Sequence, residues 1–173
     1  MKNDIISIYL INHIDLDLKN TTEEHDINNN NNNIHSFNEW VNAFRGHDIP
    51  KMVSLVTEDV RINSIIFGTY KGKDEASKYW QELYDVFPDI NINPITITAD
   101  QHRIAAEIDV TGTQKTKTAG SHGLGNNFDI CGAFIYDFTE DASINEIRMY
   151  YDSGILKKQL DTHGENTSPQ SAT

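Results

Sequence analysis

Apolar residues recur at helical spacing in three segments between residues 36 and 87. The first begins at Ser36, which together with Glu39 fits a capping box, and Gly46 is suited to ending it. A short helix is predicted after the capping residue Asp48, and a longer one from Asp74 up to Pro88. The predicted buried positions are Phe37, Trp40, Val41, Phe44, Met52, Val53, Leu55, Val56, Ala76, Tyr79, Trp80, Leu83 and Phe87.

Alternation of apolar and polar positions predicts strands in the rest of the chain. A first strand runs from Val60 to Phe67, and Gly68 and Gly72 bracket a turn after it. The second half of the chain predicts four strands in a meander and a last short helix: Ile92 to Ala99, His102 to Thr113, Phe128 to Phe138, Ile144 to Asp152, and Ile155 to Leu160. Helices that precede an antiparallel sheet indicate an α+β domain with its helices packed on one face.

Both ends of the chain differ in composition from this patterned region. Residues 1–35 contain an uninterrupted asparagine tract, Asn28 to Asn33, and residues 162–173 are also polar. Polar stretches bury too little apolar area to offset the loss of chain entropy on folding. The sequence therefore predicts a disordered asparagine-rich arm over 1–35, one domain over 36–161, and a disordered tail.

Charge and cysteine content restrict the partners. The formal net charge of −12 argues against nucleic-acid or anionic-membrane binding, because both need a basic surface. No apolar run is long enough to span a bilayer. The single cysteine, Cys131, alternates with Ala133 and Ile135, so we expect a small core residue, no disulfide and a cytoplasmic location. The histidines lack paired ligand spacing, which predicts no structural zinc.

Several short strings, taken together, resemble the SnoaL-like polyketide cyclase family, which belongs to the superfamily of nuclear transport factor 2, scytalone dehydratase and ketosteroid isomerase. The resemblance covers about residues 37–160. It rests on Thr57-Glu58-Asp59-Val60, Gly72-Lys73-Asp74-Glu75-Ala76, Val86-Phe87-Pro88-Asp89, Gly112-Thr113, Tyr150-Tyr151-Asp152 and Lys158-Gln159-Leu160.

This resemblance implies a cone-shaped barrel, open at one end, that dimerises through the outer face of its sheet. It also implies acid/base chemistry without a cofactor, such as intramolecular aldol closure of a polyketide ring. The chain departs from the family pattern at Asn63 and Tyr150, where cyclases carry histidines, at Asp161 in place of a glycine, and in the loop over residues 119–126. These departures put the aldol reaction in question and leave the fold prediction intact.

Asp152 is the candidate acid/base, because the resemblance places the catalytic aspartate of the cyclases there. A free aspartate has a pKa of about 3.9, so efficient proton transfer near neutral pH requires an apolar cavity that raises the value by desolvation. Such a cavity should measure several hundred Å³ to hold a ligand of this class. The alternative role for Asp152 is to cap the helix that follows it.

The other candidates are polar or aromatic residues with simpler structural alternatives. Asn63 and Tyr150 are suited to orienting a carbonyl, and Arg148 to attracting an acidic substrate, although a cross-strand ion pair is commoner. Glu107 is a second carboxylate candidate or part of an exposed polar face, and His122 lies in a polar loop. Aromatic residues that would line a cavity, or pack as plain core, are Phe67, Trp80, Phe134 and Tyr136.

Three functions follow from these observations. The first is a cofactor-free enzyme that acts on a small hydrophobic carbonyl compound. The second is a binding protein that holds a small lipophilic ligand in the same cavity without converting it. The third is a dimerising interaction module, which would have a filled or closed cavity.

Overall fold

A computed structural model of the chain describes residues 30–64, 68–116 and 125–161. A first helix covers residues 30–45. It is followed by α2 (Ile49–Ser54), α3 (Lys73–Val86) and α4 (Ser153–Asp161). The strands are β1 (Val56–Ser64), β2 (Gly68–Lys71), β3 (Asn91–Ala99), β4 (Arg103–Thr113), β5 (Asn127–Phe138) and β6 (Ile144–Tyr151). None of the helices in these ranges is long and apolar enough to cross a membrane.

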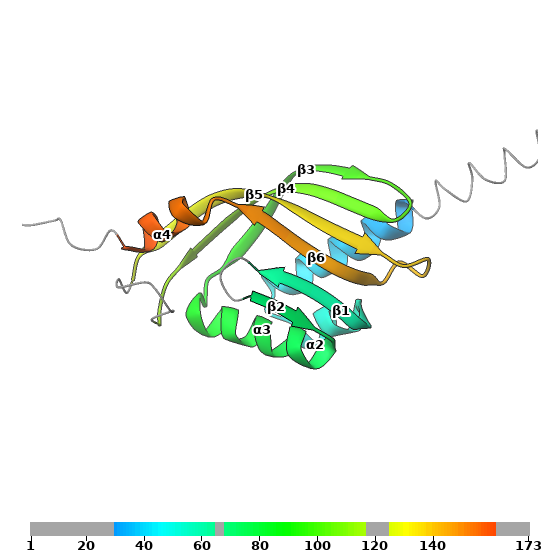
Figure 1. The fold of residues 1–173 in the computed structure, drawn as a ribbon, viewed down its shortest axis with the longest axis horizontal. Coiled ribbons are helices and arrows are strands. Elements are labelled where there is room, and N and C mark those ends of the chain that lie inside the picture. The colour runs from blue at the N-terminus through cyan, green and yellow to red at the C-terminus, as the bar shows by residue number, and fades with distance from the viewer. Residues whose placement is uncertain (1–29, 65–67, 117–124, 162–173) are drawn as a thin grey trace, which may run out of the picture.

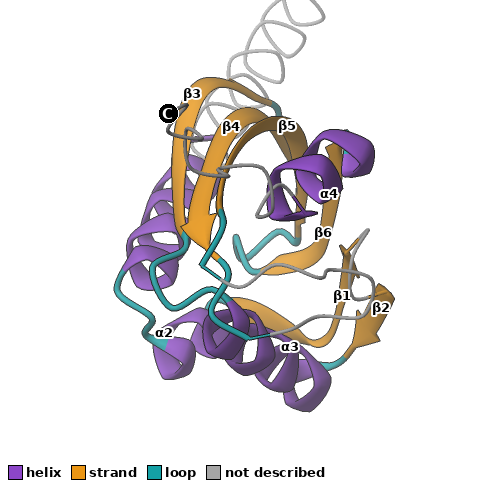
Figure 2. Cartoon of the chain, turned by 90° about the vertical axis from the view of Figure 1, so that its left-hand side faces the viewer, coloured by secondary structure: helices purple, strands orange, loops and turns teal. Residues whose placement is uncertain are grey.

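The six strands form one sheet in the order β2-β1-β6-β5-β4-β3. All neighbouring strands are antiparallel except β1 and β6, which pair in parallel. The predicted α+β class and the meander from β3 to β6 are confirmed. The sheet curls over the interior with α2 and α3 on the other side (Figures 1 and 2), but its end strands do not pair, so the cone is not a closed barrel.

The helices bury the faces that their spacing predicts. In the helix over residues 30–45, Phe37, Trp40, Val41 and Phe44 are buried against the sheet. The α3 face carries Ala76, Tyr79, Trp80, Leu83 and Tyr84 toward the interior. Each such side chain contributes roughly 1.5–3 kcal/mol when fully removed from water, so the hydrophobic effect holds both helices on the same side of the curled sheet.

The first helix begins earlier than Ser36, which is a correction. Residues 30–35 are already helical, and Asn33 is 1% exposed. Its Nδ2 donates to the backbone oxygen of Gln101 at 3.0 Å, so a buried amide in the asparagine tract is hydrogen-bonded to the β3–β4 turn. The Ser36 capping box is therefore wrong, and residues 1–29 of the predicted arm lie outside the described ranges.

Two strand predictions also need correction. β1 begins at Val56 instead of Val60, because a bulge between Val56 and Arg61 interrupts its alternation. β2 replaces part of the expected turn; it is a short edge strand with no buried face to mark it. On β3, a register shift after Pro94 and an edge position leave Ile95 and Ile97 exposed.

Cys131 is exposed instead of buried. It lies opposite Asp109 on β4, on the outer face of the sheet, and its Sγ is 3.6 Å from an Oε1 of Glu107. Desolvation raises the pKa of the Cys131 thiol, and the nearby carboxylates of Asp109 and Glu107 raise it further. Alternation along β5 was predicted correctly, but the apolar face is the one that carries Phe128, Ile130, Phe134 and Tyr136.

Candidate functional site

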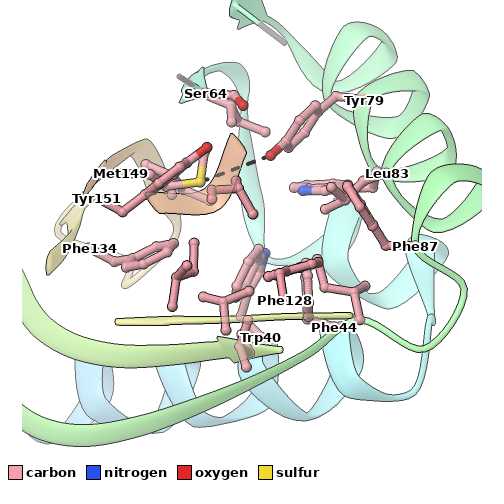
Figure 3. A pocket seen from close by; sticks show the side chains of 18 of the residues that line it. Trp40, Phe44, Ser64, Tyr79, Leu83, Phe87, Phe128, Phe134, Met149 and Tyr151 are labelled. Carbon is pink, nitrogen blue, oxygen red and sulfur yellow. Dashed lines mark hydrogen bonds between the residues drawn. The ribbon is translucent and has the colours of Figure 1, made fainter. Parts of the chain in front are cut away.

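An apolar cavity lies between the inner face of the sheet and the helices (Figure 3). Its volume is about 70 Å³, far below the roughly 300–1,000 Å³ typical of pockets for drug-sized ligands. The expected cavity of several hundred Å³ is therefore wrong for the described residues, whose aromatic rings make up much of the lining. The rings and aliphatic side chains of the lining are Trp40, Phe44, Ile62, Trp80, Leu83, Phe87, Ile90, Ile92, Val110, Phe128, Ile130, Phe134, Tyr136, Ile147 and Leu156.

The lining is completed by Met149 and by three of its four hydroxyl-bearing residues, Ser64, Tyr79 and Tyr151; the fourth is Tyr136. Figure 3 shows the hydroxyls of these three residues gathered at one end of the cavity, with the Met149 sulfur among them. The Tyr79 hydroxyl donates a hydrogen bond to the Met149 Sδ at 4.0 Å and is also hydrogen-bonded to Ser64. The cavity therefore has a polar end and an otherwise mainly apolar wall.

Each of these side chains comes from a regular element. Ser64 ends β1, on the same face as Ile62, and Tyr79 lies one turn before Leu83 on the buried face of α3. Met149 and Tyr151 alternate with Ile147 along β6 and point inward. The polar end thus forms where β1, α3 and the last residues of β6 meet.

Burial raises the pKa of Tyr79, an effect that the hydrogen bond from Ser64 partly opposes and the neighbouring Tyr151 increases. Burial likewise raises the pKa of Tyr136, with a further increase from Tyr79. Both phenols are therefore protonated at neutral pH and act as hydrogen-bond donors rather than as bases. Among the described lining residues there is no carboxylate, histidine or lysine.

Asp152 does not face the cavity. Its side chain is exposed, and Oδ1 accepts hydrogen bonds from the backbone N–H groups of Gly154 at 2.8 Å and Ile155 at 3.1 Å. The expected enclosure of this carboxylate is wrong, because Asp152 lies after the end of β6 and its exposed side chain bonds to the first turn of α4. The capping alternative describes its contacts, and the acid/base role stays a prediction.

Four other candidates lie on the outer face of the sheet instead of in the cavity. Tyr150 is 55% exposed, and Glu107 is also exposed. Arg148 forms the cross-strand ion pair that we considered, at 2.6 Å from Asp137, and also contacts Glu146 at 2.5 Å. Asn63 donates to Glu146 at 3.1 Å.

Trp80, Phe134 and Tyr136 do line the cavity, as their aromatic character suggested. Phe67 and His122 lie outside the described residues. The polar end itself, made by Ser64, Tyr79 and Tyr151, was missed as a site. The sequence carries a signal for Tyr151: the apolar alternation Ile147, Met149, Tyr151 marks the inner face of β6, whereas the family resemblance points to the next residue, Asp152.

The helix α4 covers one side of the cavity, to which it contributes Leu156. The Gln159 side chain fixes α4 to β5 through two hydrogen bonds with the backbone of Asp129, at 2.9 and 3.0 Å. The Asn126 Nδ2 donates to the backbone oxygen of Leu160 at 2.6 Å. In the described ranges no cluster of three or more histidine, cysteine, aspartate or glutamate side chains is arranged to hold a metal ion.

Residues 37–147 match the SnoaL-like domain family. No curated protein matches the chain in sequence. Solved structures resemble it throughout the folded region. One is a candidate polyketide cyclase from Xanthomonas campestris pv. campestris, which is 21% identical with a TM-score of 0.71. The alignment covers 76% of this chain and 98% of that one.

Two further structures have the same fold. A candidate SnoaL-like polyketide cyclase from Jannaschia sp. CCS1 is 14% identical, with a TM-score of 0.70 over 78% of this chain and 95% of that one. An LEH-like epoxide hydrolase from M. tuberculosis is also 14% identical, with a TM-score of 0.62 over 76% of this chain and 90% of that one. At these identities the likeness shows a common fold, on which different reactions occur.

Proposed function

This chain belongs to the SnoaL-like domain family, and we propose that its cavity binds a small, mainly apolar carbonyl compound. One observation carries this proposal: the hydroxyls of Ser64, Tyr79 and Tyr151 gather at one end of a cavity that is otherwise mainly apolar. An apolar wall with a few convergent polar groups is the usual form of a small-molecule site. Protonated phenols donate hydrogen bonds, so the ligand group that they recognise is an acceptor such as a carbonyl oxygen.

The cavity volume sets the ligand size. An engineered cavity of about 150 Å³ accommodates benzene, so a volume of about 70 Å³ favours a ligand of few atoms. Met149 gives the cavity a means of adapting, because an unbranched thioether side chain changes shape easily. A six-membered ring ketone is therefore the largest ligand that we expect the cavity to accept, and it can enter only if the Met149 side chain moves aside.

The test compares cyclohexanone with methylenecyclohexane, in which a =CH2 group replaces the carbonyl oxygen. Titrations followed by backbone amide chemical shifts should show that the wild-type protein prefers the ketone. One hydrogen bond contributes about 0.5–1.5 kcal/mol, so Tyr79→Phe or Tyr151→Phe should reduce this preference by about 2–12-fold. Tyr150→Phe is the matched control, because that neighbouring hydroxyl lies on the outer face. Failure of the wild-type protein to bind either compound would contradict the proposal.

Acid/base conversion of the ligand, of which polyketide ring closure is one form, is the second candidate. The candidate cyclases among the structural relatives support it, and so does the family resemblance, which assigns the catalytic aspartate to Asp152. If Asp152 is the acid/base, Asp152→Asn should abolish turnover of a polyketide-like substrate and leave its affinity unchanged. Because asparagine is also a good helix cap, the variant should keep its thermal stability. Undiminished turnover would exclude the assignment.

We also propose that the chain forms a homodimer through the outer face of the sheet. The centre of that face combines the small side chains of Ala105 and Ala133 with Ile135 and the exposed ring of Tyr150, and exposed tyrosines are enriched in protein interfaces.

Light scattering coupled to size exclusion tests the dimer. The wild-type protein should elute with twice the chain mass, and Ala133→Glu should be monomeric because it buries an unpaired charge. Lys78→Glu, on the exposed side of α3, is the control and should remain dimeric. A wild-type monomer at high micromolar concentration would refute the dimer and leave the binding proposal unaffected.

A further inference from the structure

The indole nitrogen of Trp40 is a buried donor without a partner. Trp40 is 4% exposed and lines the cavity, and its Nε1 has no hydrogen-bond partner among the described residues. A buried polar group left unsatisfied costs roughly 1–3 kcal/mol, so its presence in a folded core requires an explanation.

The surroundings of this nitrogen are aromatic. The Trp40 ring packs against Tyr136, Phe44 and Trp80, with ring centroids 5.5, 5.5 and 6.2 Å apart. Ring faces accept N–H donors only weakly. In Figure 3 the Trp40 indole extends from the bottom of the view with its nitrogen toward the interior, whereas Ser64 and Tyr79 lie at the top.

We infer that the Trp40 N–H is a second recognition group, which binds an acceptor at the far end of the ligand from the hydroxyl cluster. This inference rests on the proposed function and narrows its ligand class. The ligand then carries two oxygen acceptors separated by an apolar frame, as in a diketone or a keto ether. A ligand with a single carbonyl would bind but leave the indole nitrogen unsatisfied.

Two ring ketones of the same size test this inference. Cyclohexanone presents one acceptor, and cyclohexane-1,4-dione presents two at opposite ends of the same ring. Their dissociation constants are measured by amide chemical shifts for the wild-type protein and for Trp40→Phe. In a second variant L-3-benzothienylalanine replaces Trp40; this substitution keeps the shape of the indole and removes only its N–H, so the fold is preserved even if Trp40→Phe unfolds.

The decisive quantity is the ratio of the two affinities. Loss of one hydrogen bond should lower the preference for the dione by about 2–12-fold in the benzothienylalanine variant, with cyclohexanone affinity unchanged. A ratio equal to that of the wild-type protein would overturn the inference and leave the proposed function standing. If the wild-type protein binds neither ketone, the proposed function fails and the inference fails with it.

Discussion

Gly132 makes room for the inward-facing Tyr151. The two residues lie opposite each other on β5 and β6. A Cβ atom at Gly132 would lie 2.8 Å from the backbone oxygen of Tyr150, 3.0 Å from the Tyr151 Cβ and 3.1 Å from a ring carbon of Phe134. Glycine at this position therefore sets how closely β6 approaches β5, and with it the place of the Tyr151 hydroxyl at the polar end.

Gly132→Ala should displace the end of β6. Overpacking of this kind costs about 1–3 kcal/mol in unfolding free energy, and the shift of Tyr151 should weaken ketone binding. Denaturant unfolding and the cyclohexanone titration measure the two effects. Gly46→Ala is the control, because its added Cβ would meet nothing closer than 3.4 Å. Equal stability and equal affinity in Gly132→Ala would show that β6 tolerates the methyl group.

Single residues were the hardest to place from the sequence. The inner face of β6 carries the site, whereas the family resemblance points to Asp152, directly after the strand. The Asp152 side chain is exposed, where water and helix-capping contacts satisfy its carboxylate. The contribution of Tyr79 depends on the packing of α3 against β1 and β6, which no local pattern encodes.

At the scale of elements, a chain of ion pairs joins four strands on the outer face. Asp137 on β5 contacts Arg103 on β4 at 2.5 Å and Arg148 on β6 at 2.6 Å, and Glu146 contacts Arg148 and Arg61. Desolvation tends to raise the pKa of Asp137, but the two arginines outweigh it and hold the value below its usual range.

This lowered pKa predicts how stability depends on pH. A carboxyl group whose pKa is lower in the folded state stabilises the protein above its unfolded pKa, about 3.9, and loses that contribution as the pH falls through the folded value. Asp137→Asn should therefore reduce the free energy of unfolding at pH 7, and the difference from the wild-type protein should shrink below about pH 4. Asp59→Asn, on an exposed position of β1, should show little change at either pH. A difference that grows on acidification would contradict the ion-pair account.

Most elements were predictable because their patterns are long. The helical spacing from Ala76 to Leu83 and the alternation along β4 and β5 extend over many residues, so each burial face is specified repeatedly. β2 and the start of β1 were missed because an exposed edge strand and a bulge leave no regular pattern. The helical start within the asparagine tract depends on a tertiary hydrogen bond of Asn33.

At the scale of the whole molecule, the number of rings in the interior sets the size of the cavity. The sequence indicated a cone with aromatic side chains inside, and both are present. Cavity volume, however, depends on how Trp40, Trp80 and Tyr136 pack against one another, which is a property of the folded core. The family membership fixes the architecture, and the polar end distinguishes a ligand site from a filled core.

Met149→Ala should enlarge the cavity and distinguish a ligand site from a filled core. Removing the thioether should tighten cyclohexanone binding, because the ring no longer has to displace a side chain. The free energy of unfolding should decrease. Buried Met→Ala changes cost roughly 2–5 kcal/mol, and the decrease should lie in the lower part of that range because Met149 is only partly buried. Weaker cyclohexanone binding in a folded variant would show that Met149 forms a contact that the ligand needs.

The most direct measurement of ligand binding in the cavity is a crystal structure of the protein soaked with cyclohexanone. We expect ring density between the sheet and α3, with the ketone oxygen within hydrogen-bonding distance of the hydroxyl of Tyr79, Tyr151 or Ser64. Density confined to the outer face of the sheet, or an interior that stays empty at saturating ketone, would contradict this expectation.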